Sequence, residues 1–350
     1  MIQKSQDCQK IRGCTNSAFL TLIPKEKGEN LFSRFCLISL CNIGYKVITK
    51  VIANRLKRIL PKIIAENQGG FIHGRQLVDN FALVQEEIHF SLHRKEKGMV
   101  IKLDLANDFD CVRHRFLFDV LQKLGFGQNF IKWIKAYISE PWIAPPVNGG
   151  ADDFFKASRG LRQGCPLSPL LFILQASILS FYLEKKWQDQ DIIGLCITRG
   201  VKSINHALFA DDTLLLGVAS PQSTIKFKEF LEDNCKVSSS ILNNGKCHIY
   251  CWNIPTSTAS SISKCLGFVA STSWLSFKYI GLPIFHKRAL SKHSYPQIDK
   301  FKAKMQAWRS SWLNIPGKSV LNKLPLLKFS ILLVPVGIIK NMEELIRQFF

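Results

Sequence analysis

Two aspartates stand side by side between short apolar runs in the stretch HALFADDTLLLG, residues 206–217. The runs 208–210 and 214–216 predict two strands joined by a tight turn that contains Asp211 and Asp212. Like charges in an apolar setting are costly unless a cation or another partner neutralises them. An ordinary surface hairpin is the alternative, because Asp is a common turn residue. A third carboxylate is therefore needed before the pair indicates chemistry.

Asp104 supplies that third carboxylate, directly after the alternating residues MVIKL at 99–103, which predict another strand. If this strand and the hairpin are neighbours in one antiparallel sheet, the three carboxylates meet at one edge. Such oxygen ligands suit Mg²⁺, and two ions about 3.5–4 Å apart can activate a hydroxyl and stabilise a leaving pyrophosphate. Spacing alone leaves a solvated surface cluster equally open.

The elements that must position these residues follow from the periodicity of apolar residues. The stretch 37–64 predicts one amphipathic helix that ends near Pro61. Further predicted helices cover the second part of 67–94, then 114–126, 170–187, 222–235 and much of 286–350, and a strand pair is predicted around 246–252. The apolar stretches 165–183 and 324–339 are interrupted by polar residues or prolines, so buried helices are predicted there rather than membrane spans.

The charge is unevenly distributed along the 350 residues, of which 47% are hydrophobic and 21% charged, a composition typical of a globular protein. Residues 1–75 carry 13 Lys and Arg against 4 acids, residues 284–350 carry 12 against 3, and the centre contributes only +3 of the net +21. Two basic ends around a nearly neutral centre indicate a polyanionic partner held from two sides. A generically basic protein is the alternative.

The 11 cysteines form no CxxC pair, and no apolar leader follows Met1. This pattern favours reduced thiols in the cytoplasm or nucleus, and not a secreted disulfide framework. The segment CHIYC at 247–251, together with Cys235 and Cys265, could suggest zinc. The alternation within CHIYC favours a strand instead.

Three motifs follow one another along the chain: KLDLANDFD at 102–110, GLRQGCPLSPLLF at 160–172 and FADDTLLL at 209–216. They resemble, in the same order, the catalytic-region motifs of the reverse transcriptases of non-LTR, LINE-type retrotransposons, and most closely those of plants. The similarity also covers LNNGKCHIY, YIGLPI, LIPK, ISLCNIGYKVITKVIANRLK and NQGGFIHGR. One such motif is weak evidence, but the whole series in this order is specific.

This resemblance implies an α+β right-hand polymerase fold with fingers, a palm built on an antiparallel sheet, and a helical thumb. The expected boundaries are a tail at 1–14, a reverse transcriptase domain at 15–283 with fingers at 15–97 and mainly palm at 98–283, and a thumb at 284–350. The implied activity is RNA-directed DNA synthesis from dNTPs on an RNA template and a DNA primer, with Mg²⁺ or Mn²⁺ and no membrane partner. Related elements also encode an endonuclease and sometimes a ribonuclease H, so a fragment is expected.

The resemblance also implies a role for individual residues. Asp104, Asp211 and the carbonyl of Leu105 would hold the metal, and Asp212 would complete the triad. Lys246 would donate a proton to pyrophosphate, although a solvated lysine is equally open. The substrate-contacting set comprises Phe109 beneath the incoming sugar, Gln163 and Gly164 beneath template and nucleotide, and Lys25 and Arg75 at phosphates. A packed core aromatic is the alternative for Phe109.

Two places depart from the family pattern and favour a second hypothesis. The family reads Phe-Arg-Pro-Ile-Ser-Leu where this chain has Cys36 and Leu37 after Phe35. Asp108 and Cys111 stand where related sequences tend to have Ala and Arg. These changes suggest impaired activity, or a non-catalytic remnant that still binds nucleic acid. A group-II-intron-type maturase is a third hypothesis, against which the plant-LINE-like segment KFKAKMQAWRSSWLNIPGKSVL at 300–321 argues.

Overall fold

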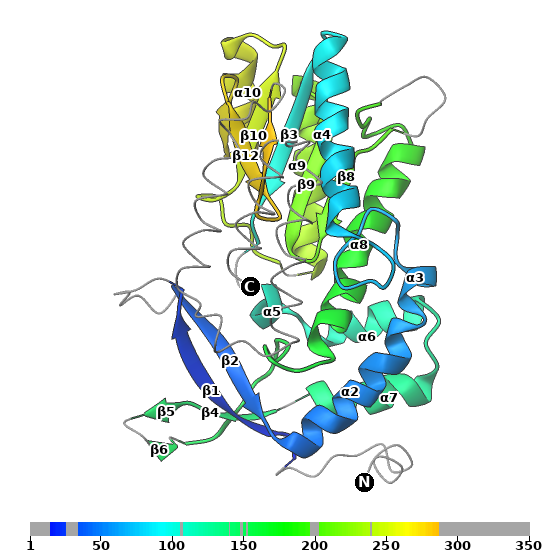
Figure 1. Cartoon of the computed structure of the whole chain (residues 1–350), viewed down its shortest axis with the longest axis vertical. Helices are drawn as coiled ribbons and strands as arrows, with labels where there is room; N and C mark the ends of the chain where they lie inside the picture. Colours follow the sequence, from blue (N-terminus) through cyan, green and yellow to red (C-terminus); the bar gives the residue numbers. More distant parts are fainter. Residues whose placement is uncertain are drawn as a thin grey trace, which may run out of the picture.

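A central five-stranded sheet carries the predicted acidic motifs (Figure 1). The computed structural model describes residues 15–25, 34–105, 108–139, 141–147, 150–151, 153–196, 203–238 and 240–286. The strand order is β11-β10-β3-β9-β8, where the strands are β3 (Gly98–Leu103), β8 (His206–Phe209), β9 (Asp212–Val218), β10 (His248–Trp252) and β11 (Val269–Ser271). All neighbours are antiparallel except β10 and β11. The predicted strand at 99–103 and the hairpin are therefore confirmed. The strand pair predicted around 246–252 is wrong in part, because only β10 forms there and its partners are the distant strands β3 and β11.

Helices cover one face of this sheet, and a helix and a hairpin cover the other. Helix α4 (Leu77–His93) and the hairpin of β12 (Ser276–Tyr279) and β13 (Leu282–Phe285) pack with one set of alternating sheet residues, among them Val100 and Leu216. Helices α8 (Ser168–Gln188), α9 (Pro221–Ser238) and α10 (Thr256–Leu266) pack with the other set, among them Ile101 and Leu215. Successive strand residues point to opposite faces, so both faces are buried and the sheet is a rigid platform.

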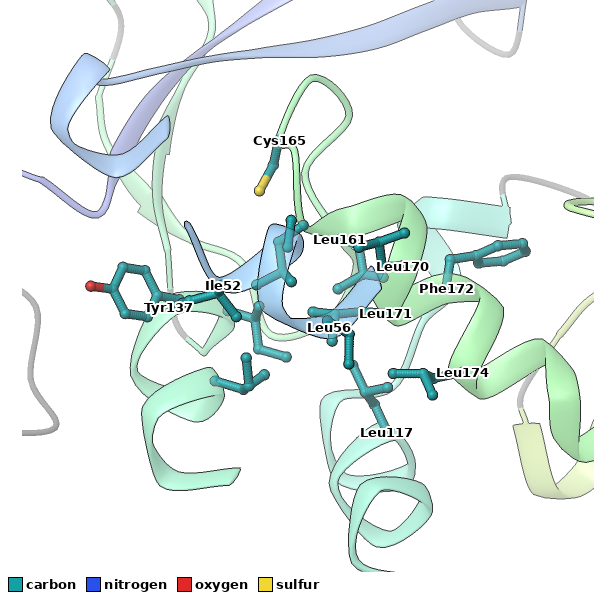
Figure 2. Packing of buried hydrophobic residues seen from close by; sticks show 14 of the residues in the cluster. Ile52, Leu56, Leu117, Tyr137, Leu161, Cys165, Leu170, Leu171, Phe172 and Leu174 are labelled. Carbon is teal, nitrogen blue, oxygen red and sulfur yellow. The ribbon is translucent and has the colours of Figure 1, made fainter. Parts of the chain in front are cut away.

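A second group of elements lies beside the platform. Its sheet has the order β2-β1-β4-β7, with β1 (Ser17–Pro24), β2 (Phe35–Cys41), β4 (Trp142–Ala144) and β7 (Phe155–Lys156), next to the short pair β5 (Pro146–Val147) and β6 (Gly150–Ala151). The accompanying helices are α2 (Ile43–Lys57), α3 (Leu60–Ile63), α5 (Asp108–Cys111), α6 (His114–Lys123) and α7 (Gln128–Ile138). Figure 2 shows the core that joins α2 and α6 to the start of α8, with Ile52, Leu56, Leu117, Leu171 and Leu174 in contact.

The helix predicted over 37–64 is wrong in its first part, because residues 37–41 belong to β2. Strand β2 pairs with β1 along its whole length, from Pro24 opposite Phe35 to Ala18 opposite Cys41. The helix begins only after Asn42, whose side chain accepts the N–H of Gly44 at 2.8 Å as an N-cap. Cross-strand pairing with a distant segment therefore overrides the local helical periodicity.

The sequence boundary between 97 and 98 does not divide the structure into two bodies. Strand β4, from the range expected to be mainly palm, pairs with β1 of the expected fingers. Helix α4, from the expected fingers, packs on the central sheet. The expected thumb at 284–350 lies outside the described residues, apart from 284–286.

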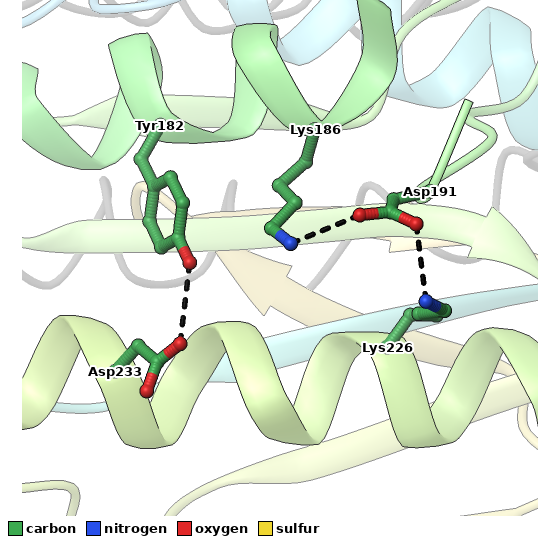
Figure 3. Close-up of polar contacts among 5 residues, drawn as sticks. All are labelled: Tyr182, Lys186, Asp191, Lys226 and Asp233. Atoms are coloured by element: carbon green, nitrogen blue, oxygen red, sulfur yellow. Dashed lines mark hydrogen bonds and ion pairs between the residues drawn. The ribbon is translucent and has the colours of Figure 1, made fainter. Parts of the chain in front are cut away.

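Three hydrogen bonds on the surface link α8 and the residues just after it to α9 (Figure 3). Asp191 accepts hydrogen bonds from Lys186 at 2.9 Å and from Lys226 at 3.0 Å, and Tyr182 donates to Asp233 at 3.3 Å. Lys186 and Lys226 lower the pKa of the Asp191 carboxyl. Exposed ion pairs add little stability, so these contacts mainly fix how the two helices align.

Two other interpretations of the sequence can be checked in the described part of the chain. No helix there is long and apolar enough to cross a membrane, and α8 is instead a buried helix. Cys247 and Cys251 lie in or next to β10 as buried free thiols, as the strand interpretation of CHIYC predicts.

Glu87 is a carboxyl buried in the middle of α4. Its side chain is 1% exposed, and neither carboxylate oxygen has a hydrogen-bond partner among the described residues. Burial raises the pKa of Glu87 to about 7, Glu96 acts in the same direction and Arg94 opposes it. The folded state thus binds this proton more tightly than the unfolded chain. Stability is therefore present at low pH and is lost as pH rises from the ordinary value of 4.5 to about 7.

A Glu87→Gln variant is expected to be more stable than the wild type at about pH 8, by up to about 3 kcal/mol, and nearly equal to it at about pH 4. The amide keeps the size of the side chain but never ionises. Urea unfolding midpoints at the two pH values measure the difference. The control is Glu86→Gln, which changes an exposed neighbour on the same helix. An equal gain in both variants, or none in Glu87→Gln, would contradict the assignment.

Candidate active site

Asp104 and Asp212 face each other at the end of the central sheet. The antiparallel register places Leu103 opposite Thr213, so Asp104 is the next residue, opposite Asp212. Alternation along the strands puts both on the sheet face that carries Val100 and Leu216. Asp104 and Asp212 therefore share one face at one end of the sheet, whereas a metal ion shared by Asp104 and Asp211 stays a prediction.

Asp211 lies in the turn that joins β8 to β9. The expected turn was Asp211 and Asp212, but Phe209 pairs with Asp212, so the turn is one residue earlier and consists of Ala210 and Asp211. Ala210 has φ 57, a left-handed conformation that non-glycine residues seldom adopt. Asp211 is exposed, and Asp212 is half-buried at the start of β9.

Asp211 and Asp104 act electrostatically on Asp212. Burial raises the pKa of Asp212, Asp211 and Asp104 raise it further, and Lys102 opposes them. A divalent cation would relieve this repulsion, because oxygen ligands with negative charge are the donors that Mg²⁺ prefers. Within the described residues, no three His, Cys, Asp or Glu side chains already surround a point where a metal ion could sit. The chemistry of the donor set nevertheless fits Mg²⁺.

The loop before β10 brings Lys246 to the same edge. Its Nζ lies 3.9 Å from Oδ2 of Asp104, and the lysine side chain is 66% exposed. The backbone N–H of Asn243 donates to the carbonyl of Asp104 at 2.8 Å, and Leu242 bridges Leu105. The Sγ of Cys247 accepts the N–H of Asp104 at 3.3 Å. Lys246 is therefore held beside Asp104 by contacts of its own loop.

Phe109, Gln163 and Gly164 form a second group. Phe109 in α5 stacks on Phe172 of α8 with ring centroids 4.8 Å apart, so it has the packing of a core aromatic on at least one side. The N–H of Leu161 donates to the carbonyl of Phe109 at 2.7 Å, and the carbonyl of Gln163 accepts the N–H of Ser39 at 2.8 Å. The loop 161–165 thus connects Phe109 of α5 to strand β2.

Gly164 in this loop has φ 95, and a Cβ there would lie 3.2 Å from the carbonyl oxygen of Ser39. Both the backbone conformation and the close approach therefore favour glycine. Its exposed backbone is accessible to a ligand, as the floor position predicted for it requires.

The two predicted phosphate contacts differ in their surroundings. Lys25 is exposed at the end of β1, and its charge opposes the burial that raises the pKa of Asp110, the residue after Phe109. Arg75 instead donates to the carbonyls of Ile64, Ala65 and Gln68. The structure gives Arg75 a role in holding this loop, and its phosphate contact stays a prediction.

The sequence family of this chain agrees with that geometry. The family described as "Reverse transcriptase (RNA-dependent DNA polymerase)" matches residues 23–284, which include every site residue above. The chain belongs to the reverse transcriptase family. By class it is thus an RNA-directed DNA polymerase, and the expected activity class is confirmed.

Curated relatives of this reverse transcriptase include proteins of transposable elements. It is 29% identical over 199 residues to the Transposon TX1 uncharacterized 149 kDa protein of Xenopus laevis, covering 57% of this chain and 15% of that protein. It is 28% identical over 199 residues to the Pol polyprotein of the R2 element of Nasonia vitripennis, covering 56% and 18%. A mitochondrial protein of Arabidopsis thaliana, AtMg01250, is 43% identical over 67 residues, covering 19% and 55%. The matched region is thus less than a fifth of the first two relatives.

Solved telomerase structures share the fold. Telomerase from Candida tropicalis, in complex with a TWJ fragment of telomeric RNA, matches with a TM-score of 0.57 and 12% identity over 97% of this chain and 56% of the telomerase. The apo telomerase of that organism matches with a TM-score of 0.53 and 13% identity over 79% and 48%. At this identity the similarity shows the fold alone, and the predicted right-hand polymerase fold is confirmed.

Three residues of this reverse transcriptase site lie outside the set predicted from the sequence. Lys102 lies two residues before Asp104 on the same sheet face and acts on Asp212, a position that strand alternation could have indicated. Asp110 is influenced by Lys25 of the hairpin. Cys247 supports the backbone of Asp104. The last two depend on contacts between distant segments, so no local pattern indicates them.

Proposed function

We propose that this chain is the polymerase part of a non-LTR retrotransposon protein of plant type, and that it copies an RNA template into DNA from a primer 3′-hydroxyl and dNTPs. The observation that carries the proposal is the pairing of Asp104 with Asp212 on one sheet face. Asp211 lies in the adjoining turn, and Lys246 lies beside Asp104. The similarity to the Arabidopsis protein supports a plant origin. Nine free thiols in the described residues fit a reducing compartment, the cytoplasm or nucleus.

In this proposal Asp104, Asp211 and the carbonyl of Leu105 hold Mg²⁺, or Mn²⁺ in its place, and Asp212 completes the acidic set. Bound metal supplies Lewis-acid activation of the hydroxyl and neutralises charge on the leaving pyrophosphate. Lys246 is near enough to the acids to give a proton to pyrophosphate. Phe109 provides a ring on which the sugar of a dNTP rests, and Gln163 and Gly164 support template and nucleotide.

Primer extension tests the proposal directly. Incorporation of dTTP on poly(rA)/oligo(dT) with Mg²⁺ should depend on template, primer and metal together.

A non-catalytic remnant that binds nucleic acid is the second candidate, because Cys36 stands where the resembling family has an arginine. Binding of the primer–template without any incorporation, with Mg²⁺ or Mn²⁺, would favour that candidate.

Binding to a primer–template is expected to weaken steeply with salt, because basic residues release counterions condensed on phosphates. Neutralisation of about five phosphates would lower affinity roughly 500-fold between about 50 and 200 mM monovalent salt. Fluorescence anisotropy with a labelled primer–template measures this slope. Asp211→Asn serves as the control, since it should leave the slope nearly unchanged. An affinity that barely changes with salt would contradict the proposal that basic residues bind the phosphates, for the active polymerase and for the non-catalytic remnant alike.

A further inference from the structure

The segment Asn67–Gly70, from the connection between α3 and α4, lies along β8 as an additional short partner. The N–H of Leu208 donates to the carbonyl of Asn67 at 2.9 Å, and the N–H of Gly69 donates to the carbonyl of Leu208 at 2.8 Å. Gln68 forms a parallel bridge to Leu208. The strand that leads into the Asp211 turn is therefore supported on its outer edge.

The side chain of Gln68 reaches beyond this pairing to the turn itself. Its Oε1 accepts the N–H of Ala210 at 2.9 Å and the N–H of Gly70 at 2.9 Å. The side chain is completely buried, and its Nε2 has no hydrogen-bond partner among the described residues. One buried acceptor thus holds the residue with positive φ that precedes Asp211.

Gly70 makes this arrangement sterically possible. A Cβ at Gly70 would lie 2.5 Å from the backbone nitrogen of Ala210, closer than a carbon atom can approach. Arg75 fixes the same segment from the other side, because it donates to the carbonyl of Gln68 at 2.7 Å. Gln68 and Gly70 therefore act together on the turn, while Arg75 keeps them in place.

We propose that Gln68 is a positioning residue, which holds the Ala210 turn and with it the Asp211 carboxylate in the position from which it can bind the metal together with Asp104. This inference rests on the proposed function, in which Asp211 is a metal ligand. A left-handed alanine is strained and persists only when its surroundings fix it. Loss of the Gln68 acceptor lets the turn relax and moves Asp211, so the effect appears first in metal binding.

The test compares Gln68→Met with a matched control, Gln85→Met. Gln85 also makes two hydrogen bonds to backbone groups, because its Nε2 donates to the carbonyl of Phe285 at 2.9 Å and its Oε1 accepts the N–H of Phe285 at 2.8 Å. Both variants remove two such bonds at nearly constant side-chain size. Only Gln68 contacts the turn before Asp211.

Two measurements need no catalysis: hydrogen exchange of peptides covering residues 206–217, and the affinity of the protein for Mn²⁺. In Gln68→Met, exchange in these peptides should rise and Mn²⁺ affinity should fall by about tenfold or more, the usual effect of losing a group that orients a metal ligand. In Gln85→Met both should stay at the wild-type level, while the thermal midpoint falls as in Gln68→Met. If Gln68→Met does not fold, Gly70→Ala replaces it in the test. Its methyl group displaces the same turn sterically, so it should show the faster exchange and weaker Mn²⁺ binding expected of Gln68→Met.

Equal exchange and equal Mn²⁺ affinity in Gln68→Met and the wild type would overturn the proposal. So would the same changes in Gln85→Met, because they would show a general loss of stability. If Asp211→Asn binds Mn²⁺ as the wild type does, the proposed function fails at its metal site. The exchange comparison then still decides whether Gln68 holds the turn.

Discussion

An Asp211→Asn variant is expected to lose primer extension by about a thousandfold or more while it keeps the wild-type fold. Asn has the size of Asp but no charge, so the site loses one ligand and part of the field that attracts a divalent cation. Asp211 is exposed in a turn, so its side chain contributes no core packing. The measurement is single-turnover incorporation at saturating dNTP, with circular dichroism to confirm the fold.

Asp119→Asn is the matched control for this experiment. Asp119 is exposed on α6, so its replacement changes the net charge by the same amount outside the acidic cluster. Wild-type incorporation in the control and none in Asp211→Asn would assign the loss to the site. Full activity of Asp211→Asn would contradict the role of the turn, and Asp104 with Asp212 would then be the ligand pair to test.

The acidic site itself could be predicted from sequence because it depends on local patterns. Alternating apolar residues define β3, and two apolar runs define β8 and β9, so the carboxylates at their ends follow. The turn was placed one residue too late, because local preference disfavours Ala at positive φ. Gln68 and Gly70 fix that conformation from more than 130 residues away in the sequence, which no local pattern contains.

Two other differences between the predicted and the observed structure also arise from contacts that no local sequence pattern contains. The strand 37–41 has helical periodicity, and only its pairing with β1 shows that it is extended. Arg75 has the charge expected of a phosphate contact, yet three loop carbonyls accept its hydrogen bonds. A sequence shows which groups could bind a ligand, but neighbours brought together by the fold decide which of them are already occupied.

A second large change in primer extension is expected from replacing Cys36, which lies in β2 opposite Ile23. Ile38 follows two residues later on the same strand face, and its Cγ2 lies 3.7 Å from the position of a Cβ on Gly164. The face that carries Cys36 therefore looks toward the loop on which template and nucleotide are proposed to rest. In the resembling family an arginine at this place holds the triphosphate with two hydrogen bonds and a permanent charge, and cysteine offers neither.

Lys25 and Arg34 are the cations nearest to Cys36 along the hairpin. The N–H of Lys25 donates to the carbonyl of Arg34 at 3.0 Å, one cross-strand pair beyond Pro24 and Phe35. Alternation puts both on the face of Cys36, but about 6–7 Å further along the strands. They are therefore poorly placed for the phosphates that an arginine at 36 would reach.

Cys36→Arg, alone or with Leu37→Pro to restore the family's backbone, is expected to raise extension at limiting dNTP by about 30-fold or more. The gain should appear as a lower KM for dNTP, because the arginine binds the triphosphate in the ground state, and as a higher kcat, because it binds the charge that develops in the transition state more strongly still. Leu40→Arg is the control, since Leu40 lies on the same face of β2, is 51% exposed and receives the same charge away from the hairpin end. If the wild-type chain already extends primers efficiently at micromolar dNTP, the remnant hypothesis is wrong. Lys25→Ala and Arg34→Ala would then identify which side chain holds the triphosphate in place of the missing arginine.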